Sequence, residues 1–310
     1  MFIYDISMQK LNLVTPLSAD LLTGPHDVEL ATEPRPAEMN KYTTGSILIV
    51  GGGVDYHGAP ILAADAANNA IAALRTGVGY VTIFVPKDKA NLVRKISPNL
   101  IVKAYDGMSL SRSYVSLICE AKHNVAVIGP GLGKSGTIYD GVAALVEREN
   151  GSGKLILIDG DAIGAIAKHK RLIGKNMILT PHRGEFARLT GVDSDDATLS
   201  QLTERAISFA KSYNCVIVLK GHETVITDGK MLKINISKSS ALATMGTGDV
   251  LSGIIAAYLA SHKNTFESAT AGVYVHSMIG DMLNESHGHH IIAEDVVRAI
   301  PDFLKHFDKN

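Results

Sequence analysis

The sequence predicts an α/β fold in which a doubly wound, mostly parallel sheet lies between two layers of helices. Short apolar segments that favour strands alternate with longer segments of helical periodicity. Most of the strand segments are apolar at consecutive positions, as in parallel strands that helices cover on both faces. The composition, 310 residues with 46% hydrophobic residues and 29 glycines, is that of a folded α/β chain and argues against disorder.

The expected elements follow one another from residue 46 onward. Strands are expected at 46–50, 80–85, 125–128, 155–158, 177–180 and 216–220. Helices are expected at 61–76, 136–148, 199–212, 250–261, 266–284 and 294–303. A hairpin with Asp228 and Gly229 in its turn is expected over 224–236. Residues 1–44 contain four prolines and little periodicity, so we expect an N-terminal arm with one short helix around 18–22, and a single domain over 45–310.

The charges and the cysteines limit the kinds of partner. Thirty basic and 31 acidic residues give a net charge of −1, so there is no electrostatic reason to expect nucleic acid or a membrane as a partner. Cys119 and Cys215 lie in apolar surroundings and are interpreted as reduced core residues. The first residues show no basic segment followed by an apolar one, and no run of about 18 apolar residues occurs. We expect a soluble cytoplasmic protein.

The most informative segment is ALATMGTGD, residues 241–249, which directly precedes an apolar helix. Gly246 and Gly248 allow backbone angles closed to other residues, and the N-terminus of the helix favours an anion. Asp249 stands at the helix start, where a carboxylate can take a proton from a nucleophile beside a bound phosphate. An anion hole beside a base predicts phosphoryl transfer. The alternative is a helix that Asp249 merely caps.

Two glycine-rich loops follow predicted strands, where ligands of open parallel sheets bind. The segment GGGVDYHGAP, residues 51–60, lacks the spacing of the dinucleotide fingerprint, although Gly58 and Ala59 let a flat ligand approach the backbone. Its alternative is a tight turn before a helix. The segment GPGLGKSG, residues 129–136, is expected to form a rigid turn with exposed N–H groups.

Charged residues follow three further strands. In DGDA, Asp159 and Asp161 can orient Mg²⁺ through water or accept from ligand hydroxyls, and Asp161 can equally cap the next helix. In TPHRGEF, we expect His182 and Glu185 to project beyond the sheet, although a lone histidine is more often structural. Lys220, at the end of its strand, is well placed to meet a phosphate.

Other histidines are interpreted as structural. The run HGHH, residues 287–290, matches no standard spacing of metal ligands and is expected to be a solvated loop. His276 is expected to be a packed or hydrogen-bonded residue of its helix.

Taken together, these motifs resemble those of the ADP/ATP-dependent NAD(P)H-hydrate dehydratases, a family of the ribokinase-like superfamily. The matching run extends from about residue 41 to 303 and contains YHGAP, GPGLG, DGDA, TPHRGE, LKGHET and ATMGTGD, followed by AGVYVHSMIGD. GTGD is shared widely among ribokinase-like enzymes, whereas TPHRGE together with GPGLG is more specific. The resemblance implies a ribokinase-like fold of three layers, α/β/α.

The resemblance implies repair of hydrated NADH and NADPH. The S isomer carries a hydroxyl at C6 of its ring, which is phosphorylated by ADP or ATP before the ester eliminates phosphate. Phosphate is a better leaving group than hydroxide, and the lone pair of the ring nitrogen drives its expulsion. The resemblance also implies Mg²⁺ between the phosphates and a homotetramer. Because residues 1–44 are too short to be the epimerase domain that often precedes this one, we expect a separate epimerase.

Carried to matching positions, the resemblance implies roles for individual residues. Asp249 is implied as the base, with the anion hole formed by the N–H groups of Gly246, Thr247 and Gly248. The implied nucleotide contacts are Lys220, Gly221, His222, Glu223, Thr224 and Gly248. The implied contacts to the hydrated dinucleotide are Ala59, Gly131, His182 and Asp249. The ligands of Mg²⁺ are not assigned, and Asp159, Asp161 and Glu185 are candidates.

One segment departs from the family pattern, and two other functions remain open. Residues 238–241, Lys-Ser-Ser-Ala, replace the usual turn with Asn-Gly, and the serine hydroxyls can substitute as donors. A small-molecule kinase acting on a hydroxymethylpyrimidine, a thiazole alcohol or a sugar needs GTGD and Lys220 but not TPHRGE. A nucleotide-binding scaffold without turnover is disfavoured by the charge of Asp249 beside phosphates. The sequence contains no feature that selects ADP over ATP, or hydrated NADH over hydrated NADPH.

Overall fold

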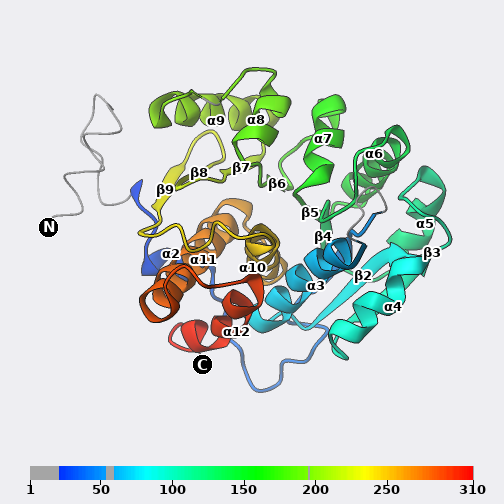
Figure 1. Ribbon diagram of the computed structural model, residues 1–310, viewed down its shortest axis with the longest axis horizontal. Coiled ribbons are helices and arrows are strands. Elements are labelled where there is room, and N and C mark those ends of the chain that lie inside the picture. Colours follow the sequence, from blue (N-terminus) through cyan, green and yellow to red (C-terminus); the bar gives the residue numbers. More distant parts are fainter. Residues whose placement is uncertain (1–20, 54–58, 195, 310) are drawn as a thin grey trace, which may run out of the picture.

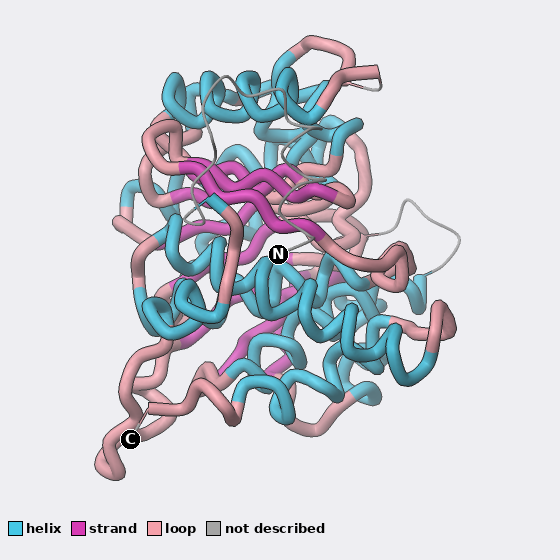
Figure 2. Tube along the Cα trace, turned by 90° about the vertical axis from the view of Figure 1, so that its left-hand side faces the viewer, coloured by secondary structure: helices cyan, strands magenta, loops and turns pink. Residues whose placement is uncertain are grey.

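The computed structural model describes residues 21–53, 59–194 and 196–309, and for 59–64 the backbone alone. In this part of the chain nine strands form one sheet, which lies between two layers of helices (Figures 1 and 2). The predicted three-layer α/β/α architecture is therefore confirmed. The short helix predicted around 18–22 falls largely outside the described residues. No helix in the described part of the chain combines the length and apolar composition needed to cross a membrane.

The sheet is parallel over most of its width. The strand order is β3-β2-β1-β4-β5-β6-β7-β8-β9, parallel from β3 to β7 and antiparallel from β7 to β9. The strands are β1 (Ser46–Val50), β2 (Tyr80–Pro86), β3 (Ile101–Tyr105), β4 (Val125–Ile128), β5 (Leu155–Ile158), β6 (Met177–Leu179), β7 (Val216–Leu219), β8 (Glu223–Thr227) and β9 (Leu232–Ile236). The six predicted strands and the hairpin, which is the β8–β9 pair, are confirmed. β3, at the edge of the sheet, was not predicted.

Two sets of helices cover the faces of the sheet (Figure 1). One face is covered by α3 (Ala59–Thr76), α4 (Lys87–Ile96), α10 (Thr247–His262) and α11 (Thr265–His287). The other is covered by α5 (Val115–Cys119), α6 (Gly136–Gly151), α7 (Asp161–Lys168), α8 (Arg183–Thr190) and α9 (Leu199–Tyr213). Short 3₁₀ turns occur at Arg112–Tyr114 and Lys170–Leu172. α2 (Pro25–Ala31) and α12 (Ala293–Leu304) pack outside α10 and α11.

Burial on both faces explains why the strands are apolar at consecutive positions. In β1, Leu48 and Val50 contribute to the core beneath α6 and α7. Ile47 and Ile49, which alternate with them, contribute to the core beneath α3 and α10. Side chains of a strand point alternately to the two faces, so a strand between two helical layers needs apolar residues throughout.

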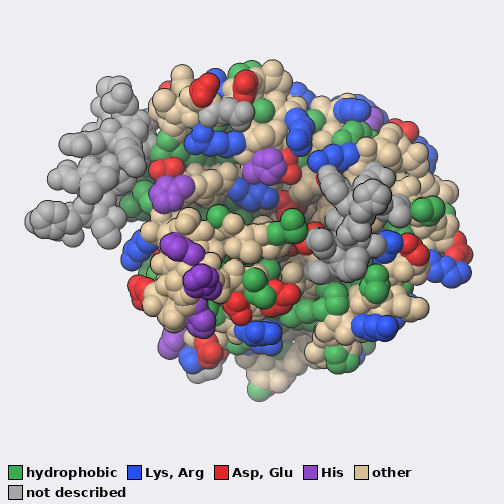
Figure 3. All heavy atoms as spheres, viewed as in Figure 1, with side chains coloured by type: hydrophobic (Ala, Val, Ile, Leu, Met, Phe, Trp, Pro, Cys, Tyr) green, Lys and Arg blue, Asp and Glu red, His purple; other side chains and the backbone are tan. Residues whose placement is uncertain are grey.

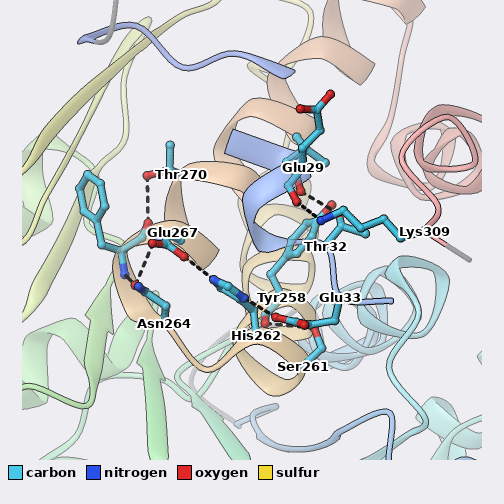
Figure 4. A network of polar contacts seen from close by, with 12 residues as sticks. Glu29, Thr32, Glu33, Tyr258, Ser261, His262, Asn264, Glu267, Thr270 and Lys309 are labelled. Carbon is cyan, nitrogen blue, oxygen red and sulfur yellow. Dashed lines mark hydrogen bonds and ion pairs between the residues drawn. The ribbon is translucent and has the colours of Figure 1, made fainter. Parts of the chain in front are cut away.

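The segment before β1 is packed against the helices that follow the sheet. Val28 of α2 is fully buried beside α11. The side chain of His262 joins this segment to α11, because Nδ1 lies 2.6 Å from Glu33 Oε1 and Nε2 contacts Glu267 (Figure 4). At the C-terminal end, Lys309 also donates to the backbone of this segment. The division into an arm over 1–44 and a domain over 45–310 remains a prediction.

The two cysteines carry no disulfide. Cys215 is buried, and Cys119 is half-buried with its thiol 3.1 Å from Glu149 Oε1. Burial raises the pKa of both thiols to about 12, so both stay protonated at neutral pH.

Candidate functional site

Two glycine loops meet where the strand order reverses, between β1 and β4. Gly52 N donates to Pro130 O at 2.9 Å, and Gly53 N donates to Gly131 O. A Cβ at Gly53 would lie 1.9 Å from Leu132 O, so only glycine fits this contact. Ligands of open parallel sheets bind at such a switch point. The structure therefore brings residues 51–53 of the first predicted loop and residues 130–132 of the second together.

Asp161 is turned toward the second of these loops. Its carboxylate accepts from Gly133 N at 2.9 Å and lies 3.7 Å from Lys134 Nζ. α7 begins at Asp161 after Gly160, and within the described residues no side chain caps it. The alternative in which Asp161 caps the helix is therefore wrong. Ala59 begins α3, but its side chain lies outside the described residues, as do residues 54–58.

A partly buried ion pair joins the ends of β5 and β7. Lys220 Nζ donates to Asp159 Oδ1 at 2.8 Å, and Ser252 Oγ donates to Oδ2 at 2.6 Å. Burial alone would raise the pKa of Asp159, but the charge of Lys220 and the hydrogen bonds hold it below its usual value. Burial would lower the pKa of Lys220, whereas nearby carboxylates, Asp159 first, raise it. Both groups are therefore charged. Figure 3 shows basic, acidic and histidine side chains gathered between the places where Figure 1 labels β7 and α10.

The N-terminus of α10 faces the same space as Lys220. Gly246 precedes the helix with φ of 87°, and within the described residues no side chain caps the helix. The N–H of Thr247 makes only a long bond, 3.4 Å, to Thr244 O. A Cβ built on Gly248 would meet only Lys220 Nζ, at 3.7 Å. The positive end of the helix and a lysine therefore flank one space, an arrangement that favours an anion.

Asp249 is the third residue of α10, so the alternative in which it caps the helix is wrong. It is half-buried. Burial raises its pKa well above the usual value, and Asp159 and Asp65 add to the shift. Burial also raises the pKa of Asp65 to about 6, and Asp161 and Asp159 again contribute. A carboxylate with a raised pKa is a stronger proton acceptor and suits general base catalysis. Asp65, one acid in an alanine-rich helix, was not predicted.

A cavity of about 390 Å³ lies between the end of β7, the β8–β9 hairpin, α10 and α11, a volume typical of small-molecule sites. The predicted nucleotide contacts that line it are Lys220, Gly221, His222, Thr224 and Gly248. Glu223, which pairs with Ile236 in the same hairpin, does not line it. Lining residues that the sequence interpretation missed as contacts include Asn235, Ser237, Leu251, Val273, His276 and Ser277.

The segment that departs from the family pattern forms one wall of this cavity. Ser239 and Ser240 line it. Asp281 of α11 accepts hydrogen bonds from Lys238 N at 3.1 Å and from the hydroxyls of Ser237 and Ser239 at 3.4 Å. A buried carboxylate thus fixes the turn, a role that sequence reasoning did not assign to Asp281.

His182 directly precedes α8 and caps it, and the sequence analysis did not predict this helix. Its Nδ1 accepts from Gly184 N at 3.1 Å and Glu185 N at 3.3 Å, while Glu185 accepts from His182 N at 2.9 Å. This reciprocal capping is a structural role. The ring is nevertheless 56% exposed. The loop before it lies beside Lys220, whose N–H donates to Pro181 O at 2.8 Å.

The protonation of this pair follows from its surroundings. Burial and then the charge of Lys220 lower the pKa of His182, so its ring is neutral and carries its proton on Nε2. Burial raises the pKa of Glu185 to about 7. Among the described residues, no three His, Cys, Asp or Glu side chains come together as a metal-ligand set. His287, His289 and His290 are exposed, as expected of the predicted solvated loop, but His287 is still the last residue of α11.

Comparison with known protein families identifies the family of the chain. A family model for NAD(P)H-hydrate dehydratases matches residues 47–302. The chain belongs to the NAD(P)H-hydrate dehydratase family. It is 34% identical over 295 residues to the ADP-dependent (S)-NAD(P)H-hydrate dehydratase of Cenarchaeum symbiosum, which covers 93% of this chain and 98% of that protein.

Other relatives of this dehydratase-family chain are longer. It is 33% identical over 294 residues to the bifunctional NAD(P)H-hydrate repair enzyme Nnr of Pyrobaculum aerophilum, and the match covers 94% of this chain but 57% of that protein. The chain thus spans little more than half the length of such bifunctional relatives.

Solved structures share the fold. The ADP/ATP-dependent NAD(P)H-hydrate dehydratase of Bacillus subtilis, crystallised with ATP and Mg²⁺, has a TM-score of 0.77 and 26% identity, covering 94% of this chain and all of that one. A ribokinase-like superfamily protein of Enterococcus faecalis has a TM-score of 0.79 at 24% identity, covering 96% of this chain and all of that one. The predicted ribokinase-like fold is confirmed.

Proposed function

We propose that this protein is a dehydratase that restores NADH and NADPH from the S isomers of their hydrated forms at the expense of ADP or ATP. The observation that carries the proposal is the position of Asp249, whose raised pKa suits a base, in the first turn of α10 beside Lys220 and the cavity. The family of the chain and the names of its relatives support the same activity.

The nucleotide occupies the cavity with its terminal phosphate at the N-terminus of α10. The N–H groups of Gly246, Thr247 and Gly248 stabilise the charge that develops on the phosphoryl group. Lys220 through Thr224 hold the nucleotide, and Lys220 supplies the nearest positive charge. Because Glu223 lies outside the cavity wall, its part is to fix the hairpin through β8.

Asp249 takes the proton of the C6 hydroxyl as this oxygen attacks the terminal phosphorus. The new O–P bond forms while the bond to the departing AMP or ADP breaks. The ring nitrogen then pushes phosphate out with both electrons of the C–O bond, and loss of a proton from the neighbouring carbon restores the dihydropyridine. The net change is loss of water from the dinucleotide and hydrolysis of the nucleotide.

The hydrated dinucleotide lies over the two glycine loops at the switch point. Gly131 and Ala59 let the ring approach the backbone, and His182, neutral with its proton on Nε2, donates to the substrate. The carboxylates of Asp159 and Asp161 already accept hydrogen bonds from the protein. They therefore suit contact with Mg²⁺ through bridging water rather than direct ligation. Mg²⁺, when bound, neutralises charge on the phosphates. We also propose a cytoplasmic homotetramer and a separate epimerase that interconverts the two hydrates.

The test is incubation of the protein with hydrated NADH, Mg²⁺ and either ADP or ATP. The proposal predicts recovery of reduced-nicotinamide absorbance and release of one phosphate per NADH formed. A stable phosphorylated product without free phosphate would instead indicate a small-molecule kinase. Nucleotide binding with no turnover of any hydrate would indicate a scaffold.

A further inference from the structure

Asp159 is held by two donors that come from different elements of the fold. The residue directly follows β5 and is 3% exposed. Its Oδ1 accepts from Lys220 Nζ at 2.8 Å, at the end of β7. Its Oδ2 accepts from Ser252 Oγ at 2.6 Å, and Ser252 is fully buried in α10. Lys220 has a proposed part at the phosphate, whereas Ser252 has none.

Ser252 lies on the side of α10 that Lys220 faces. Gly248 and Ser252 are four residues apart in the helix, so they share one side of it. Lys220 Nζ lies 3.7 Å from the position of a Cβ on Gly248, and Ser252 holds the carboxylate to which this Nζ donates. One side of α10 thus lies against Lys220 in its first turn and binds Asp159 one turn later.

The donors and acceptors of the ion pair show what the hydroxyl of Ser252 contributes. An ammonium group has three N–H donors. Among the described residues, Lys220 Nζ donates to Asp159 Oδ1 alone, so two donors remain for a ligand in the cavity that Lys220 lines. Loss of the donor to a buried carboxylate oxygen costs free energy. Without Ser252 Oγ, the ammonium group would therefore turn toward Oδ2 and away from Gly248.

We propose that Ser252 is a positioning residue that keeps Lys220 directed at the terminal phosphate of the nucleotide. Its hydroxyl occupies Oδ2 of Asp159, so that Lys220 serves only Oδ1 and presents its other N–H donors at the N-terminus of α10. Because Ser252 is fully buried and does not line the cavity, it acts through Asp159 and Lys220 and not by contact with the nucleotide. The inference rests on the proposed function in that the cavity takes ADP.

The test compares the affinities of ADP and AMP by calorimetric titration, which needs no turnover of a hydrate. The Kd of AMP divided by the Kd of ADP reports the contacts of the terminal phosphate, because AMP lacks this group. In Ser252→Ala this ratio should fall about 3- to 10-fold, a part of the worth of a hydrogen bond to a charged group.

The matched control is Ser268→Ala, which removes another hydroxyl from a buried helix. Ser268 is fully buried in α11, and its hydroxyl has no hydrogen-bond partner among the described residues. It does not line the cavity. Ser268→Ala should therefore keep the wild-type ratio of the two Kd values.

A double-mutant cycle separates positioning of Lys220 from support of the helix. If Ser252 acts through Lys220, adding Ser252→Ala to Lys220→Met should change the ratio by less than about 2-fold. The same fall in both backgrounds would show that Ser252 only supports α10, and it would overturn the inference. Ser252→Cys, whose thiol is a weak donor, should lower the ratio less than Ser252→Ala does, and it keeps the test open should the alanine variant not fold.

Three other results overturn the inference and leave different parts of the account standing. An unchanged or higher ratio in Ser252→Ala shows that Ser252 does not direct Lys220 at the phosphate. Equal affinity of the wild type for ADP and AMP shows that Lys220 does not serve the terminal phosphate, although the cavity still takes a nucleotide. If the wild type binds no nucleotide, the proposed function fails and the inference fails with it. The expected ratios without turnover of any hydrate support the inference and refute the dehydratase activity alone.

Discussion

Replacement of Gly248 by alanine separates the binding role of the α10 N-terminus from its structural role. Gly248 is the second residue of α10, and its backbone does not have a positive φ. A Cβ at this position would touch nothing except Lys220 Nζ, at 3.7 Å. The fold therefore accepts alanine, whereas the space that the methyl group enters is the one proposed for the terminal phosphate.

The magnitudes follow from these contacts. Alanine in place of glycine stabilises a helix by up to about 1 kcal/mol. In a chain of 310 residues that change raises the Tm by up to about 1.5 °C. A phosphate oxygen displaced from the helix N–H groups loses a hydrogen bond to a charged group, which is worth about 1.5–3 kcal/mol. The Kd of ADP should therefore rise by about 10- to 150-fold.

The assay pairs thermal unfolding with calorimetric titration of ADP. Gly151→Ala is the matched control, because Gly151 ends α6 with nothing within 4 Å of an added Cβ and lies outside the cavity. This control should bind ADP as the wild type does. Unchanged ADP affinity in Gly248→Ala, with an unchanged or raised Tm, would refute the placement of the phosphate. A large fall in Tm would refute the open space around Gly248 at the start of α10.

Three further predictions concern charges near the site and at the opposite end of α10. Asp65→Asn should move the acid limb of the pH profile of kcat/KM to lower pH, because the charge of Asp65 helps to raise the pKa of Asp249. A shift of this limb to higher pH would contradict the effect of Asp65 on Asp249. Asp281→Asn should raise the Kd of ADP about 3- to 10-fold, since neutral hydrogen bonds replace the charge-assisted ones to residues 237–239. An unchanged Kd, measured by titration, would show that the turn does not need the charge of Asp281. Burial alone would lower the pKa of His262, but its partners Glu33 and Glu267 raise this pKa above the usual value. The ion pairs of His262 therefore contribute fully to stability below pH about 6.5, and this contribution is lost as the pH rises through the raised pKa. The Tm difference between the wild type and His262→Gln should therefore be larger at pH 6 than at pH 9, and an equal difference at both would contradict the ion pairs.

The central strands and the long helices were predictable because their pattern is repeated and strong. β3 was not, because its residues 101–104 include a lysine and alternate between exposure and partial burial at the edge of the sheet. α4 was missed because six of its ten residues are polar or charged, and two of its four apolar residues, Leu92 and Ile96, are exposed. α8 was not predicted, since its start depends on reciprocal capping between His182 and Glu185, which the sequence analysis did not use.

The candidate site was predictable where it follows from the strand ends. Because Asp159 and Lys220 directly follow β5 and β7, that rule predicts both at one edge of the sheet. Asp65 and Asp281 come from the middle or end of helices, where the sequence does not reveal which side faces the cavity. Their proximity to the site is a product of helix packing on the sheet.

The most direct test of the account is a single-turnover experiment with Asp249→Asn, hydrated NADH, Mg²⁺ and ADP. The variant should bind ADP as the wild type does, because the amide keeps the size of the side chain and the helix N-terminus is unchanged. Formation of NADH and release of phosphate should both slow by at least about a hundredfold, the scale of a lost general base. Formation of NADH at the wild-type rate would contradict the assignment of Asp249 as the base.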